Sequence, residues 1–115
     1  MDEFVLIFRN DFQPEIKLSP DEMQAIMKQW QTWMGGIAAN GQLANGGNRL
    51  GGEGNTVRPG NVVTNGPYAE IKEMVGGYIV IKAGSIDDAA EIAKGCPILT
   101  VGGNVEVRNI IPMAN

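Results

Sequence analysis

Residues 77–97 of the chain read GYIVIKAGSIDDAAEIAKGCP, and much of the architecture follows from them. The first seven residues place apolar side chains on two alternating faces, which is typical of a β-strand. Ser85 then stands where a helix N-cap is expected, and two aspartates follow in the first turn, where the helix dipole favours negative charge. Gly95 and Pro97 end the helix. The stretch therefore predicts a strand followed directly by a short helix.

The same order of elements stands at the start of the chain. Residues 3–9 (EFVLIFR) predict a strand that is apolar on both faces. Residues 18–41 predict a long helix, in which Ser19 is the N-cap and Glu22 closes an S-x-x-E capping box. Apolar residues recur along this helix at spacings of three and four, so that one face of it is apolar.

Between these two units the chain is rich in glycine and asparagine, which favours turns and short strands. A turn is expected at Pro59 and Gly60. Residues 45–54 are expected to form a surface loop, because they lack the spacing of the P-loop and dinucleotide-binding motifs. The further strands that we expect lie at residues 42–44, 56–58, 61–64 and 104–111.

The element order is therefore strand–helix–strand, repeated once. It predicts a ferredoxin-like α+β domain, βαββαβ, over residues 1–115, with a four-stranded antiparallel sheet, a hairpin excursion and two helices on one face. Residues 3–9 and 77–83 also carry apolar side chains on the opposite face, for which the chain has no further covering element. A second copy would cover it, so we expect a homodimer packed sheet to sheet.

Composition excludes several classes of function. The net charge is −4 and the nine basic residues are scattered, which argues against a nucleic-acid partner. The chain has no histidine, so histidine-based triads and zinc sites are excluded, and no metal or other cofactor is expected. The acidic start and the short apolar runs predict a cytoplasmic protein without a membrane partner. Cys96 is expected to be a small buried side chain rather than a nucleophile.

The candidate site centres on residues 65–70 (NGPYAE), where a Gly-Pro pair predicts a tight turn that holds neighbouring side chains in defined directions. The candidate catalytic residues are Tyr68, as a proton donor, and Glu70, as a general base. The candidate ligand-binding residues are Asn65, Arg9, Asp11 and Trp30. Asn65 is equally suited to capping the turn, and Trp30 to packing in the core, so both interpretations stay open.

The tetrapeptide at residues 65–68 (NGPY), followed by Ala-Glu at 69–70 and by Gly-Gly at 76–77, resembles the motif of the YCII-related proteins, and within them of the DGPF-domain group. The resemblance extends to both helices and to residues 105–108, and covers essentially the whole chain. It implies a ferredoxin-like subunit that forms a dimeric α/β barrel, with a cleft lined by sheet and loop residues.

Two departures from the family pattern limit what the resemblance implies. Asn65 replaces the acid of the Asp-Gly-Pro-Phe motif, and the chain lacks the histidine of the His–Asp pair suggested for the wider family. We expect a small dimeric protein that binds or transforms a small molecule near residues 65–70, and whether it is an enzyme stays open. The alternatives are a non-catalytic regulatory partner of a sigma factor, suggested by the gene context of the group, and a paralogue that has lost its chemistry.

Overall fold

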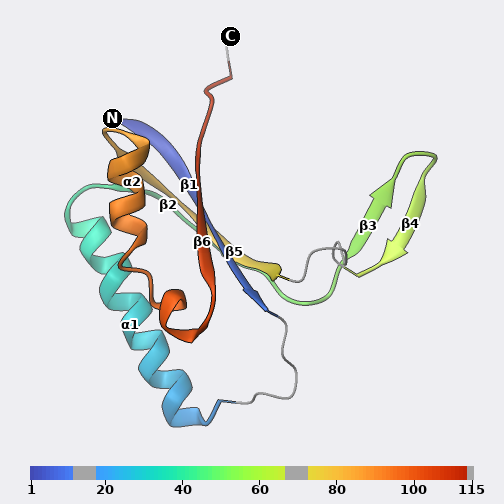
Figure 1. Cartoon of the computed structure of the whole chain (residues 1–115), viewed down its shortest axis with the longest axis horizontal. Coiled ribbons are helices and arrows are strands. Elements are labelled where there is room, and N and C mark those ends of the chain that lie inside the picture. Colours follow the sequence, from blue (N-terminus) through green and yellow to red (C-terminus); the bar gives the residue numbers. More distant parts are fainter. Residues whose placement is uncertain (12–17, 67–72, 114–115) are drawn as a thin grey trace.

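The computed structural model describes residues 1–11, 18–66 and 73–113, and it has the predicted ferredoxin-like α+β fold. Its main sheet is antiparallel, with strand order β2-β5-β1-β6, and the helices α1 and α2 lie on one face of it (Figure 1). The bounds of these elements are β1 (Asp2–Asp11), α1 (Pro20–Ala39), β2 (Leu43–Arg49), β5 (Glu73–Ala83), α2 (Ile86–Ala93) and β6 (Asn104–Asn109).

The alternation of β1 separates the two faces of the sheet. Phe4, Leu6 and Phe8 are buried under the helices, whereas Val5 and Ile7 point the other way and are half-buried. Burial of a large apolar side chain such as Leu6 contributes roughly 2 kcal/mol. The rest of the buried core consists of Ile37, Ile79, Ile81, Ala83, Ala89, Ala93, Cys96 and Ile98. The helix-covered face of the sheet is therefore the core of the subunit.

The predicted capping box begins α1. The Glu22 amide donates to Ser19 Oγ at 3.2 Å, and the Ser19 amide donates to Glu22 Oε1 at 3.3 Å. The helix ends at Asn40, as expected. Only its C-terminal half packs on the sheet, because Met23 and Met27 are 47% and 56% exposed while Ile37 is buried.

Three strands of the main sheet, β1, β2 and β5, are longer than the sequence pattern indicated, and β6 ends at Asn109 rather than at residue 111. β2 runs through part of the segment expected as a loop, because an edge strand pairs through its backbone and needs no alternation of side chains. Gly47 makes the pairing possible: its φ is +66°, and a Cβ there would lie 1.6 Å from the Tyr78 carbonyl oxygen. β5 begins at Glu73 rather than at Gly77, and the register shift opposite Phe8 and Arg9 accommodates the glycines.

A separate hairpin, β3 (Asn55–Arg58) and β4 (Val62–Asn65), projects from the body of the subunit (Figure 1). Its turn follows Pro59, where Gly60 and Asn61 have φ values of +82° and +62°, and this confirms the predicted hairpin excursion. A short 3₁₀ helix, η1 (Pro97–Val101), was not predicted from the sequence. It follows α2 directly and leads into β6.

Candidate functional site

The sheet face that the helices leave uncovered, called the open face below, has an apolar centre. Val5 of β1 pairs with Val80 of β5, and Ile7 pairs with Tyr78. All four side chains are half-buried, because neighbouring strands shield them from the sides while no described element packs over them. The centre of the open face is therefore a narrow apolar floor.

A cluster of charged side chains borders this floor along β6. Glu106 lies opposite Ile7, and its carboxylate accepts a hydrogen bond from Arg9 Nε at 3.2 Å. Arg108 Nη1 lies 3.8 Å from the other oxygen of the same carboxylate. The Arg9 side chain is only 21% exposed, so its guanidinium is held against the sheet. Two cations share one anion, which leaves this border with a net positive charge.

Polar groups also border the floor on the other sides. On β2, Asn48 Nδ2 donates to the Tyr78 hydroxyl oxygen at 3.0 Å, and the phenol proton stays available for another acceptor. At the far end of the face, Glu3 lies opposite Lys82 in the register of β1 and β5. An apolar surface with a few convergent polar groups resembles the lining of a small-molecule site, and such sites are concave, so this face would need a second surface over it to form one. The positive border suits a carboxylate, which guanidinium groups bind well.

The structure separates the sequence-derived candidates rather than gathering them. Arg9 lies on the open face. Trp30 lies on the opposite face of the sheet, with its ring 4.9 Å from that of Phe8 in an edge-to-face contact. Asn65 is exposed at the end of β4, paired with Asn55. Asp11 ends β1, and its position is described only at the level of the backbone.

The two candidate catalytic residues, Tyr68 and Glu70, lie outside the described residues. Conversely, three residues that the structure places on the open face were not among the sequence candidates: Glu106, Tyr78 and Asn48. A signal for two of them was present, because the alternation in residues 104–111 and 77–83 puts Glu106 and Tyr78 on the face opposite the core. Asn48 had no such signal, since it lies in a glycine-rich segment.

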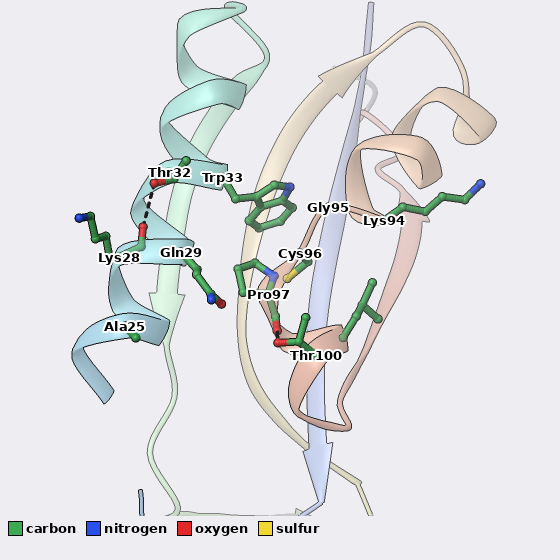
Figure 2. A pocket seen from close by; sticks show the side chains of 11 residues that line it. Ala25, Lys28, Gln29, Thr32, Trp33, Lys94, Gly95, Cys96, Pro97 and Thr100 are labelled. Atoms are coloured by element: carbon green, nitrogen blue, oxygen red, sulfur yellow. Dashed lines mark hydrogen bonds between the residues drawn. The ribbon is translucent and has the colours of Figure 1, made fainter. Parts of the chain in front are cut away.

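A groove of about 740 Å³ opens on the helical side, between α1 and the segment from α2 to η1 (Figure 2). Trp33 and Gln29 point into it from α1, and Cys96, Pro97 and Thr100 form the facing wall. The described residues that line it are Ala25, Lys28, Gln29, Thr32, Trp33, Lys94, Gly95, Cys96, Pro97, Leu99 and Thr100.

Most polar side chains in the groove already form hydrogen bonds or ion pairs with nearby groups of the protein. The Thr32 hydroxyl donates to the Lys28 carbonyl, and the Thr100 hydroxyl to the Pro97 carbonyl, as Figure 2 shows. Trp33 Nε1 donates to the Ile92 carbonyl at 3.1 Å. These groups therefore have few hydrogen bonds left for a ligand, and the groove is a weaker candidate site than the open face.

Cys96 is not a nucleophile of this groove. The side chain is 2% exposed, as expected from the sequence. Burial raises the pKa of its thiol to about 11, while a hydrogen bond with the Ile98 backbone acts in the opposite direction. The thiol is therefore protonated at neutral pH, and the thiolate that nucleophilic chemistry requires is scarce.

Two further features concern the described ranges of the chain. No group of three or more carboxylate or thiol side chains there is placed to hold a metal ion. Neither described helix combines the length and the apolar character needed to cross a membrane.

The model of the YCII-related domain matches residues 4–114, which is nearly the whole chain. The search of curated proteins finds no match. The matched range contains all of the main sheet except the first two residues of β1. It also contains both α-helices and the projecting hairpin.

Proposed function

Because the chain belongs to the YCII-related domain family, we propose that it works as a homodimer in which the two open faces cover each other and a small molecule binds in the crevice between them. The finer assignment to the DGPF-domain group, carried by residues 65–70, is part of this proposal. So is the dimeric α/β barrel that the resemblance implies.

The composition of the open face supports the dimer. Its apolar floor is framed by charged and amide groups, which is the pattern of a protein–protein interface with an apolar core and a polar rim. Val5, Ile7 and Val80 would leave water when a second sheet covers them, and this favours association by roughly 25 cal/mol per Å² of apolar surface removed. The interface is isologous, so each floor packs on its own copy.

The observation that carries the small-molecule proposal is the placement of Arg9 and Arg108 around one carboxylate, beside an apolar floor. A ligand with an apolar body and one carboxylate matches this arrangement. Its body would lie at the edge of the floor, in the crevice that the two packed sheets leave open, and its anionic group would meet the arginines, where charge-assisted hydrogen bonds are strong. Glu106 holds the Arg9 guanidinium in place, and the Tyr78 hydroxyl can donate to a second polar atom of the ligand.

Chemistry on such a ligand would fall to the residues of the 65–70 motif. Tyr68 as proton donor and Glu70 as general base are the catalytic candidates, and Asn65 and Asp11 remain candidate ligand contacts. Trp30 is not part of this proposal, because it packs on Phe8 on the opposite face of the sheet. No metal or other cofactor is part of this proposal. Binding and catalysis are separate claims, and the binding claim can be tested first.

The test is a thermal-unfolding screen with small aromatic and aliphatic carboxylates and their neutral amides. A carboxylate that binds the folded protein raises the unfolding temperature, whereas the matching amide does not. Arg9→Gln should abolish this shift. Lys28→Gln, which removes a charge from the groove on the other side of the subunit, is the matched control and should retain it.

Two results would contradict the proposal: no carboxylate in the panel stabilises the protein, or Arg9→Gln responds as the wild type does. The regulatory alternative makes a different prediction, because a protein partner should be captured whether or not any carboxylate binds. If a sigma factor is captured by the wild type and not by Arg9→Gln, the open face binds a protein partner rather than a small molecule.

A further inference from the structure

The hairpin of residues 55–65, called the arm below, exposes apolar side chains to water although it stands apart from the main sheet. In the described part of the chain, β3 and β4 form a two-stranded sheet of their own. A two-stranded hairpin by itself is marginally stable in water. Yet its valines are strongly exposed, with Val57 at 69%, Val62 at 52% and Val63 at 58%.

The two faces of the arm carry different side chains. Val57 pairs with Val63, and Asn55 with Asn65, so these four residues share one face, called the valine face. The other face carries Thr56 and Thr64 together with the Arg58–Val62 pair.

The threonine hydroxyls of the second face bond to the arm and its base. Thr56 Oγ1 donates to the Gly66 carbonyl at 3.1 Å, and Thr64 Oγ1 donates to the Thr56 carbonyl at 3.3 Å. Both threonine hydroxyls therefore already donate to carbonyl groups of the arm itself or of its base. The valine face instead presents two adjacent apolar side chains without a cover, and is the face suited to docking.

The overall dimensions show how far the arm reaches. The radius of gyration of the Cα atoms is 15.9 Å, whereas a compact chain of this length has about 13 Å. The arm contributes to this extension, because it stands clear of the helices and the main sheet (Figure 1). Its surface therefore faces away from the body of its own subunit.

The proposed homodimer supplies a second copy of the chain as a neighbour of the arm, and the area of the main sheet leaves room for a further contact. The four strands have 10, 7, 11 and 6 residues, and at about 3.3 Å per residue and 4.8 Å between strands they cover roughly 540 Å². A stable interface buries about 800 Å² on each partner. The flat outline is a lower limit to the accessible surface of the sheet, so contact between the two sheets alone is of modest size, and an arm on each subunit adds contact to it.

We propose that each arm reaches over the dimer interface and lays its valine face on the second copy of the chain. This inference rests on the homodimer of the proposed function and adds a second contact to it. Two-fold symmetry makes the contact twice, once per arm.

The arm also carries Asn65 on its valine face. Docking therefore brings this ligand-binding candidate to the partner subunit rather than to its own sheet. The ligand crevice is then built by both chains, and it is incomplete in a monomer.

The test compares dimer dissociation constants, measured by sedimentation velocity, for substitutions of neighbouring residues on opposite faces of the arm. Val63→Thr keeps shape and strand propensity but adds a polar group to the valine face. It should weaken the dimer about tenfold, and Val57→Thr/Val63→Thr about a hundredfold. Val62→Thr on the opposite face is the matched control and should leave the constant unchanged. Circular dichroism of each variant checks that the subunit remains folded.

The outcomes separate this inference from the proposed function. If the wild type is a dimer and neither valine-face variant changes the dimer dissociation constant, the arm contact is wrong. The proposed sheet-to-sheet dimer is then unaffected. Equal weakening by Val62→Thr and Val63→Thr also overturns the assignment to the valine face. A monomeric wild type removes the homodimer and the arm contact together.

Discussion

Gly47 is the residue at which the structure makes its sharpest energetic prediction. Replacing it with alanine puts a Cβ 1.6 Å from the Tyr78 carbonyl oxygen and 2.6 Å from the Tyr78 carbonyl carbon. Both atoms belong to the backbone of β5, so no side chain can rotate to relieve the overlap. The residue also has a φ of +66°, where a side chain costs about 1–2 kcal/mol.

The clash adds to this cost, because β2 must move away from β5 to admit the methyl group. The pairing of Asn48 with Tyr78 and of Arg49 with Gly77 would be disturbed, at about 1 kcal/mol for each hydrogen bond lost. Gly47→Ala should therefore lower the free energy of unfolding by about 3 kcal/mol or more. The neighbouring Gly46→Ala is the control: its Cβ meets nothing within 4 Å, and we expect a change within about 0.5 kcal/mol.

Urea denaturation at fixed protein concentration measures both effects, with the fluorescence of Trp30 and Trp33 as the probe. A slope of about 1.5 kcal/mol per molar urea converts the expected loss into a midpoint about 2 M lower. A Gly47→Ala midpoint that coincides with the wild type would refute the close packing of β2 on β5. An equally large loss in Gly46→Ala would show that glycine in this strand matters for another reason.

Three further changes have defined expected results. Gly35→Ala and Gly36→Ala fill open space on α1, where a Cβ meets nothing within 4 Å, so each should raise the free energy of unfolding by about 0.5–1 kcal/mol; a lower urea midpoint for either would contradict this. Ser19→Ala removes the capping box and should lower the free energy of unfolding by about 1 kcal/mol. Ser19→Asp can still cap the helix and should lower it less, so equal losses in the two variants would argue against a capping role. Burial raises the pKa of Cys96 above its ordinary value of 9 to about 11, so the stability that the protonated thiol contributes is complete below pH 9 and is lost as the pH rises to 11. Urea midpoints across this range should fall more steeply for the wild type than for Cys96→Ala, and parallel curves would be inconsistent with the raised pKa.

The elements with strong local signals were predictable from the sequence. Ser19 and Glu22 located the start of α1, and Ser85 that of α2, because capping is a matter of a few adjacent residues. β1 was predictable because its alternation separates a buried face from a half-buried one. The extension of β2 to Arg49 was not, since it depends on backbone pairing with β5 and on a glycine that allows close approach.

The candidate site was harder to predict because its residues come from four strands. Arg9 stood out at a strand end, but its partner Glu106 is 97 residues away, and only the strand order brings the two together. The aromatic pattern of α1 did not reveal which face of the sheet Trp30 would contact. It packs on Phe8, on the side opposite Arg9.

The molar mass in solution tests most directly whether two copies cover the open face. Light scattering coupled to size-exclusion chromatography, at micromolar concentration, should give about 25 kDa, twice the subunit mass of 12.3 kDa. Val80→Asp, which places a charge in the apolar floor, should shift the mass towards that of one subunit. A wild type that elutes as a folded particle of 12.3 kDa would contradict the dimer and the crevice between its sheets.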